Sequence, residues 1–318
     1  MKQLMLGNEA VARGLYEAGC RFVSSYPGTP STEITEYVAR YDEIYSEWAP
    51  NEKVSAEAAI GACFGGARSF CAMKHVGLNV CADPVFTVSY TGVGAGLVIA
   101  VADDPGMHSS QNEQDSRHYA IAAKLPMLEP SDSAECIEFT KLAFEISEDF
   151  DTPVFLRTAT RVAHSQSLVS LSDRVEKELV PYEKNVQKYV MTPGNAIKRH
   201  PVVEERMEKL RDFAETSGIN PIEMGDTSVG FITAGVCYQY LKECLPNASV
   251  LKLGMVNPLP MKLIADFASK VDKLIIIEEL DPVIETQVRA AGINVSGGKN
   301  LFGLCGELSQ NKIRKALG

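Results

Sequence analysis

The sequence predicts an α/β protein built on a doubly wound parallel sheet, followed by a second, smaller α/β domain. The chain has 318 residues, which at roughly 150 residues per domain suggests two domains. Up to about residue 160, short apolar runs alternate with segments of helical periodicity, as in successive βα units. The same alternation starts again at Ser228, after a polar stretch.

The elements of the first domain follow from periodicity and from stop signals. Gly19 is the expected C-cap of the first helix, and Pro30 fits the first turn of the second. One helix should break near Pro84, and Ser131 or Ser133 should cap the last. The predicted helices are residues 7–19, 30–41, 53–66, 79–90 and 133–147, and the predicted strands are 21–26, 44–49, 69–73, 97–102 and 153–156.

The remainder of the chain divides into a linker and the second domain. We expect the first domain over residues 1–162, the linker over residues 163–227 and the second domain over residues 228–318. The middle segment is polar and mixed in charge, with one amphipathic surface helix over residues 201–217. The second domain should hold strands 229–233, 250–253 and 273–278, with helices at 236–245, 262–268 and 282–290.

Charge and cysteine usage exclude several classes of protein. There are 31 Lys+Arg against 41 Asp+Glu, a net charge of −10, and no basic cluster, which argues against nucleic-acid or anionic-membrane binding. No apolar run approaches the ~18–20 residues of a membrane span, and the N-terminus lacks the pattern of a signal peptide. The 8 cysteines form no C-x-x-C, so we expect buried thiols in a cytoplasmic protein and no metal site.

Three glycine motifs that suggest nucleotide binding lie in the wrong context. The glycines of residues 92–96 precede a predicted strand, whereas a dinucleotide fingerprint follows one. Residues 297–299 lack the preceding glycine and the following hydroxyl of a phosphate loop. Gly225-Asp226 begins like a thiamine-diphosphate magnesium motif but also precedes a strand. These contexts disfavour a simple NAD dehydrogenase.

Polar residues gather in loops that follow predicted strands. The loops are residues 26–32, 51–53, 74–79 and 105–115. Ligands of open parallel sheets bind at the carboxyl edge of the strands. We therefore expect the functional site at this edge.

These loops resemble the N-terminal part of the α subunit of indolepyruvate ferredoxin oxidoreductase, a thiamine-diphosphate-dependent 2-oxoacid:ferredoxin oxidoreductase. The resemblance rests on Tyr26-Pro27-x-Thr29-Pro30-Ser31 with Gly28 inside it, on the run from Met73 to Asn79, and on Asn257-Pro258-Leu259-Pro260. It covers essentially the whole chain. It implies a pyrimidine-binding fold for the first domain and a transketolase C-terminal-like fold for the second.

The resemblance assigns Glu52 the central catalytic role. Thiamine enzymes use a glutamate that hydrogen-bonds N1′ of the aminopyrimidine, so that the 4′-imine can remove the C2 proton of the thiazolium. In relatives it precedes a small-residue helix with a glycine nine positions later, as Gly61 follows Glu52. Glu57, with Gly66 nine later, is the local rival, and a helix-dipole role is the alternative for Glu52.

The same resemblance nominates further site residues. His75 is a candidate acid/base or hydrogen-bond donor, and Thr29, Lys74 and His108 are candidate substrate ligands. An ordinary turn or solvated surface remains the alternative for each, and Gln111, Glu113 and Asp115 match a family loop only loosely. The expected cofactor-binding residues are Glu52, Tyr26, Pro27, Gly77 and Asn79.

The family pattern also continues beyond what this sequence holds. The Mg²⁺-dependent diphosphate-binding domain and the cysteine-ligated [4Fe-4S] segment of the α subunit are missing, so the chain is either a piece of a longer protein or a split subunit. The expected partners are that diphosphate-binding and ferredoxin-like portion, a β subunit, ferredoxin and coenzyme A, in an oligomer. By itself the chain would supply half of a thiamine diphosphate site, and it would not turn over substrate.

Two functions of different class remain open. The first is a component of an oxidoreductase that converts indolepyruvate or another arylpyruvate to an acyl-CoA with electrons to ferredoxin, or a relative acting on another 2-oxoacid or an aldehyde. The second is a non-catalytic scaffold subunit of the same fold. Glu52→Gln in the assembled complex separates the two.

Overall fold

The structure is a computed structural model that describes residues 2–318, and its first sheet has seven strands in the order β12-β6-β7-β5-β4-β2-β3. All neighbouring pairs are parallel except β12 with β6. The chain runs from β2 outward to β3 and then to β4 on the other side of β2, so the order changes direction between β2 and β4, as expected for a doubly wound sheet. The strands are β2 (Phe22–Ser25), β3 (Tyr45–Trp48), β4 (Ser69–Lys74), β5 (Leu97–Asp103), β6 (Met127–Leu128), β7 (Val154–Ala159) and β12 (Met255–Asn257).

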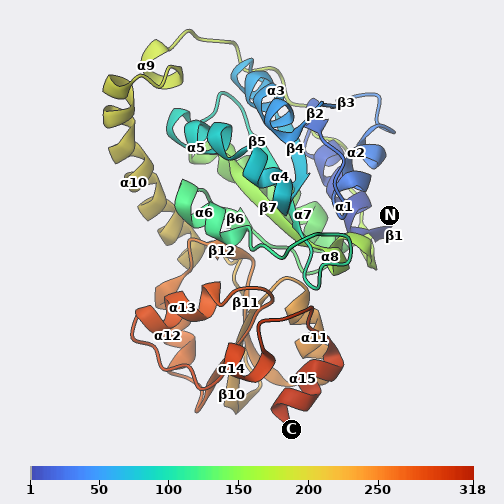
Figure 1. The fold of residues 1–318 in the computed structure, drawn as a ribbon, viewed down its shortest axis with the longest axis vertical. Helices are drawn as coiled ribbons and strands as arrows, with labels where there is room; N and C mark the ends of the chain where they lie inside the picture. The colour runs from blue at the N-terminus through green and yellow to red at the C-terminus, as the bar shows by residue number, and fades with distance from the viewer. Residues whose placement is uncertain (1) are drawn as a thin grey trace.

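Helices cover both faces of this sheet (Figure 1). Alternate side chains of β4 belong to different core clusters: Phe70 and Ala72 face one layer of helices, while Cys71 and Met73 face the other. The first layer holds α1 (Gly7–Glu17), α2 (Thr32–Val38) and α7 (Ser133–Asp149). The second holds α3 (Glu52–Phe64), α4 (His75–Val80), α5 (Ala82–Thr91) and α6 (Arg117–Ala123). The predicted α/β class is confirmed.

The second sheet has the order β13-β10-β11-β9 and lies below the first in Figure 1. Its core is continuous with the second helical layer, since Ile232 and Leu251 share a cluster with Ala59 of α3 and Val85 of α5. The strands are β9 (Ile222–Glu223), β10 (Asp226–Ala234), β11 (Ala248–Leu253) and β13 (Leu274–Ile277); the helices are α11 (Val236–Cys244), α12 (Met261–Ala268), α13 (Val283–Ala290), α14 (Lys299–Phe302) and α15 (Gln310–Leu317).

The segment between the two sheets is tied to the first domain. After α8 (Thr160–His164), β8 (Gln166–Ser170) pairs antiparallel with β1 (Lys2–Leu6). An extended strap, residues 171–185, then crosses the ends of α1 and α3, where Val175 N and Val180 N donate to the carbonyls of Glu17 and Gly66 at 2.9 Å each. It continues into α9 (Val186–Tyr189) and α10 (Pro193–Thr216), which reaches the second domain.

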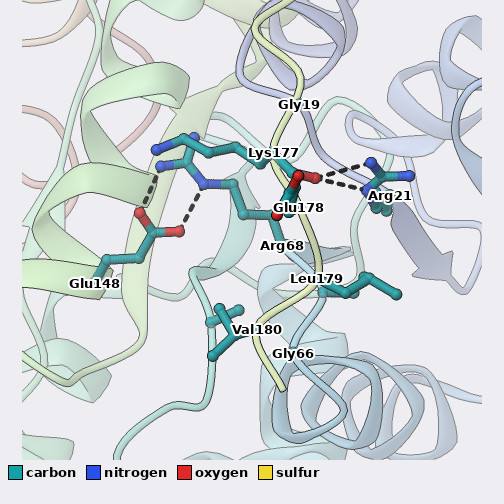
Figure 2. A pocket seen from close by; sticks show the side chains of 11 residues that line it. Gly19, Arg21, Gly66, Arg68, Glu148, Lys177, Glu178, Leu179 and Val180 are labelled. Atoms are coloured by element: carbon teal, nitrogen blue, oxygen red, sulfur yellow. Dashed lines mark hydrogen bonds and ion pairs between the residues drawn. The ribbon is translucent and has the colours of Figure 1, made fainter. Parts of the chain in front are cut away.

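The strap requires glycine where it crosses (Figure 2). Gly66 has φ +91°, and a Cβ there would lie 1.8 Å from the Val180 carbonyl oxygen. Beside the crossing, Arg68 forms a two-pronged ion pair with Glu148, with both N–O distances at 2.6 Å. The cavity that remains is about 50 Å³, so the strap is closely packed.

Several elements differ from the sequence prediction. A helix, α4, stands where residues 74–79 were expected to form a loop, and the break between α4 and α5 falls at Cys81 rather than near Pro84. Asp132, not a serine, caps α7 by accepting from Glu135 N at 2.9 Å. The helix expected at 201–217 begins eight residues earlier, capped by Thr192, and contains Pro201.

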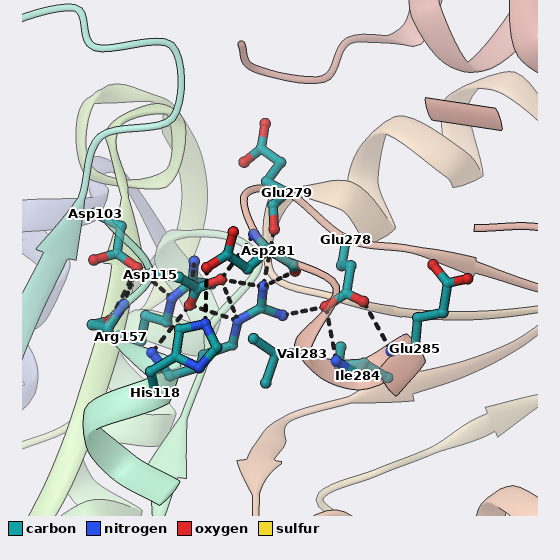
Figure 3. Close-up of polar contacts among 12 residues, drawn as sticks. Asp103, Asp115, His118, Arg157, Glu278, Glu279, Asp281, Val283, Ile284 and Glu285 are labelled. Carbon is teal, nitrogen blue, oxygen red and sulfur yellow. Dashed lines mark hydrogen bonds and ion pairs between the residues drawn. The ribbon is translucent and has the colours of Figure 1, made fainter. Parts of the chain in front are cut away.

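A buried ion network joins the two domains (Figure 3). Arg117 is 1% exposed, and its two Nη atoms lie 2.6 Å from carboxylate oxygens of Asp115 and of Glu278, while Nη2 also donates to the carbonyls of Glu279 and Asp281. Burial alone would disfavour the charge on Asp115, but Arg117 and Arg157 outweigh it and hold the pKa of Asp115 well below its usual range.

The network extends into the first sheet through Arg157. Its Nε lies 2.8 Å from Asp103 Oδ2, and its Nη1 lies 2.7 Å from Glu129 Oε1. On the other side, burial raises the pKa of Glu279 to about 7. The charges at the domain boundary are therefore mostly paired and removed from water.

No helix among residues 2–318 is long and apolar enough to cross a membrane.

Arg117→Met should strongly destabilise the chain. The change leaves the Asp115 and Glu278 carboxylates buried without their shared cation, which typically costs about 3–5 kcal/mol in the free energy of unfolding. Urea denaturation at pH 7 measures this loss in the free energy of unfolding. Arg314→Met is the control, because Arg314 is half-exposed and lies 3.8 Å from Glu243, and it should change stability by less than about 1 kcal/mol. Equal effects of the two variants would contradict the importance of the network.

Candidate functional site

The carboxyl ends of four neighbouring strands, β5, β4, β2 and β3, lie at one edge of the first sheet. The four loops or helix starts nominated from the sequence leave the sheet at this edge. The residues that follow these strands are Asp104, His75, Tyr26 and Ala49. The topology therefore brings the predicted site residues to one edge.

Glu52 is the first residue of α3 and sits against α4. The helix begins there because Asn51 caps it by accepting from Val54 N at 3.0 Å. Glu52 is 8% exposed, and no hydrogen bond or ion pair within residues 2–318 reaches its carboxylate. The rival Glu57 has a side chain 53% exposed and lies 4.0 Å from Lys53. Of these two glutamates, Glu52 is therefore the one that is buried and has no partner among residues 2–318.

Gly77 provides the surface against which Glu52 rests. A Cβ at Gly77 would lie 2.5 Å from Glu52 Oε1 and 2.6 Å from its Cγ. Only glycine leaves room for the carboxylate in this position. Asn79, two residues further along α4, is exposed and accepts a 2.5 Å hydrogen bond from the Tyr119 hydroxyl.

His75 and Lys74 are buried where β4 meets α4. His75 is 1% exposed; its Nε2 lies 3.2 Å from the Asn112 carbonyl oxygen, and its Nδ1 has no partner. Lys74 Nζ donates to the Ser109 carbonyl oxygen at 2.7 Å. Burial lowers the pKa of Lys74, although the nearby Asp104 carboxylate opposes the shift.

The 26–32 loop lies across from Lys74, since a Cβ at Gly28 would be 3.0 Å from Lys74 Cβ. Gly28 N donates to Thr32 Oγ1 at 2.9 Å, which holds the turn into α2. Tyr26, Pro27 and Thr29 are exposed, and Thr29 is followed by a cis peptide bond to Pro30. Their side chains are thus available to a ligand at the edge.

The fourth loop, residues 105–114, lies over Lys74 and His75 but also reaches the second domain. His108 Nε2 lies 3.0 Å from Glu307 Oε2, so this ring is engaged with the second domain. Glu113 accepts from Gly106 N at 2.6 Å. Gln111 is exposed.

The sequence reasoning missed two groups that shape this edge. Asp104 accepts from Ser109 N, Ser110 Oγ and Thr160 Oγ1 at 2.6–2.8 Å; burial opposes its ionisation, but these bonds prevail and lower its pKa. The Asp103-Asp104 pair directly after an apolar strand was the available signal. The backbone carbonyls of Ser109 and Asn112 had no signal in the sequence, because every residue has a backbone carbonyl.

The site is an open edge and not an enclosed pocket. Several hollows lie away from this edge: one of about 810 Å³ on the second domain by α15, one of about 390 Å³ beside Asp151 and Lys188, and one of about 250 Å³ between α11 and the start of α7. Within residues 2–318, no cluster of three His, Cys, Asp or Glu could hold a metal ion. At this edge the Glu52 carboxylate has no partner among residues 2–318, Lys74 Nζ is bonded to Ser109, and His75 Nδ1 is buried without a partner.

Family models match nearly the whole chain. Residues 13–216 match the thiamine-diphosphate-binding model of pyruvate flavodoxin/ferredoxin oxidoreductases, and residues 226–316 match the indolepyruvate oxidoreductase domain. The chain belongs to the pyruvate flavodoxin/ferredoxin oxidoreductase family. The second match and the curated relatives are named for indolepyruvate oxidoreductase, which confirms the resemblance seen in the sequence.

Relatives within the family carry names of two kinds. Indolepyruvate oxidoreductase subunit IorA of Archaeoglobus fulgidus is 44% identical over 94% of this chain and 50% of its own length. That of Pyrococcus horikoshii is 43% identical over 91% and 47%. The 2-oxoglutarate synthase subunit KorA of Methanothermobacter thermautotrophicus is 32% identical over 54% and 48%. The chain spans about half the length of these curated relatives.

Solved structures share the fold of this family member at low identity. A 2-oxoglutarate:ferredoxin oxidoreductase from Magnetococcus marinus superposes with a TM-score of 0.80 at 18% identity, over 100% of this chain and 65% of that one. A split-gene transketolase gives a TM-score of 0.58 at 15% identity, over 98% and 96%. The second, smaller domain and the fold class are thereby supported.

Gly77→Ala should disrupt the site without unfolding the family member. The added methyl group displaces the Glu52 carboxylate, and a displacement near 1 Å can reduce turnover roughly 10- to 100-fold. Steady-state rates of the assembled oxidoreductase measure this effect. Gly194→Ala, whose Cβ meets nothing within 4 Å, is the control and should leave the rate unchanged. A Gly77→Ala enzyme of normal rate would contradict the proximity of Gly77 and Glu52.

Proposed function

We propose that the chain supplies the pyrimidine half of a thiamine diphosphate site in an oxidoreductase that decarboxylates indolepyruvate or other arylpyruvates. In the complete reaction the 2-oxoacid and coenzyme A yield an acyl-CoA and CO₂, and two electrons reduce ferredoxin. The observation that carries this proposal is the buried, unpartnered Glu52 carboxylate resting on Gly77 in a member of this family.

The residues at the edge fit an aminopyrimidine. No hydrogen bond or ion pair within residues 2–318 engages the Glu52 carboxylate, and a ring N–H facing Glu52 would provide a partner. The missing side chain at Gly77 leaves room for the Glu52 carboxylate that would face the ring, and exposed Tyr26, Pro27 and Asn79 can line the site. When bound, thiamine diphosphate supplies a carbon nucleophile and an electron sink for 2-oxoacids.

The chain's own residues would hold the proton and the substrate. Glu52 holds a proton at the pyrimidine N1′ and thereby sets the tautomer of the ring. Lys74 and Thr29 can bind the substrate carboxylate or oxo group. His75 Nε2 faces the Asn112 carbonyl and so carries the ring hydrogen, which leaves Nδ1, the nitrogen without a partner, as an acceptor. His108 is a weaker candidate ligand because its ring is engaged by Glu307.

The exposure of this edge supports a partner surface over the site. Large apolar side chains are exposed on the elements that surround it: Tyr26, Trp48, Val54, Val80 and Phe86. We propose that the diphosphate-binding portion, with its Mg²⁺ and with [4Fe-4S] clusters for electron transfer, covers the edge. That portion, a β subunit, coenzyme A and ferredoxin are the proposed partners.

The proposed arylpyruvate specificity follows the names of the relatives. The proteins named indolepyruvate oxidoreductase subunits are 41–44% identical over at least 90% of the chain, whereas those named 2-oxoglutarate synthase subunits are 31–32% identical over about half. Rates with indolepyruvate and with 2-oxoglutarate in the assembled enzyme compare the two substrate classes directly.

Glu52→Gln tests the assignment. The variant preserves size but loses the carboxylate that holds the proton, so the assembled enzyme should lose about 10²- to 10⁴-fold in kcat. Reduction of ferredoxin with indolepyruvate and coenzyme A measures the rate. Glu57→Gln, on the exposed face of the same helix, is the matched control and should retain activity. Full activity of the Glu52 variant would remove the catalytic assignment and favour a scaffold role.

A further inference from the structure

Two backbone carbonyls of the 105–114 loop hold side chains of the proposed site. The Ser109 oxygen accepts from Lys74 Nζ at 2.7 Å, and the Asn112 oxygen lies 3.2 Å from His75 Nε2. Neither carbonyl belongs to a helix or strand. The attachments of the loop therefore determine where these two oxygens lie.

One attachment lies within the first domain. Asp104, directly after β5, accepts from Ser109 N at 2.8 Å and from Ser110 Oγ at 2.6 Å. Glu113 closes the loop by accepting from Gly106 N at 2.6 Å. These bonds fold the loop on itself and hold its start, and the ion pair of Asp115 with Arg117 fixes the residue that follows its end.

The 105–114 loop is also attached to the second domain, through Glu307. Its Oε2 lies 3.0 Å from His108 Nε2, and Gly106, at φ +85°, is so close that a Cβ there would lie 3.3 Å from Glu307 N. Arg161 holds both carboxylate oxygens, at 2.6 and 2.7 Å, and with the contact from His108 it lowers the pKa of Glu307 against the effect of burial.

The segment carrying Glu307 is itself fixed to the domain boundary. Leu308 N donates to Glu279 Oε1 at 2.8 Å, and the carbonyl of Glu279 accepts from buried Arg117. A continuous set of contacts thus runs from the interdomain ion network to the tip of the loop.

We infer that Glu307 is a positioning residue through which the second domain sets the geometry of Lys74 and His75. It holds His108 and packs on Gly106, the loop keeps its shape, and the two loop carbonyls fix the lysine and the imidazole. The holding of the loop stands on the contacts alone; its effect on substrate rests on the proposed function.

Hydrogen exchange on the full chain tests the holding of the loop. Glu307→Ala should raise amide exchange in residues 105–114 several-fold, and His108→Ala should do the same with no further increase in the double variant. Glu243→Ala is the matched control, since Glu243 pairs with exposed Arg314 in the same domain. Unchanged exchange in the loop of the Glu307 variant would overturn the inference.

Kinetics of the assembled enzyme test the effect on substrate. Glu307→Ala should raise KM for the 2-oxoacid about fivefold, as loss of one partly exposed charged contact predicts, with kcat within twofold. Glu307→Gln keeps an acceptor for His108 and the packing on Gly106, so it should restore most of the lost affinity. If the loop of the variant exchanges faster but KM is unchanged, Glu307 does not affect substrate binding through Lys74 and His75, and this part of the inference is overturned.

The outcomes separate this inference from the proposed function. If the wild-type assembly turns over no 2-oxoacid, or Glu52→Gln is fully active, the proposed function fails while the exchange experiment still decides whether Glu307 holds the loop. If both of those controls behave as proposed, the KM of the Glu307 variants decides the relay.

Discussion

The buried guanidinium of Arg117 is the interaction on which the arrangement of this chain depends. It lies between Asp115 of the first domain and Glu278 of the second, with both N–O distances at 2.6 Å. A charge removed from water is tolerated only when its partners are in place, so the two domains have a strong preference for one relative position. Asp115 closes the loop that crosses the carboxyl edge of the sheet, and this edge inherits its geometry from that fixed contact.

Only a few side chains define the candidate site at this edge. Glu52 is a buried carboxylate with no partner among residues 2–318, and Gly77 leaves it room by having no side chain. Lys74 Nζ and His75 Nε2 are held by backbone oxygens, and the other imidazole nitrogen, Nδ1, is buried without a partner. An open edge with exposed apolar neighbours fits half of a site better than a complete one.

Much of this could be predicted from the sequence. Alternating apolar patterns gave the α/β class, and the resemblance to the family, in which the glutamate precedes a small-residue helix, favoured Glu52 over Glu57. Tertiary features left no local signal: β12 is three residues long and pairs with a strand some 130 positions away, and Arg117 meets Glu278 at a separation of 161. Proline favours the first turn of a helix, which predicts a start at Pro201, but α10 begins at Pro193 and tolerates the missing N–H of Pro201 in its interior.

Calorimetric titration of thiamine diphosphate with Mg²⁺ tests the central claim most directly. The account places half of the cofactor site on this chain, so the chain alone should bind the cofactor weakly or not at all, and addition of the diphosphate-binding portion should produce tight, Mg²⁺-dependent binding that Glu52→Gln weakens. Tight, Mg²⁺-dependent binding to this polypeptide alone would contradict the account.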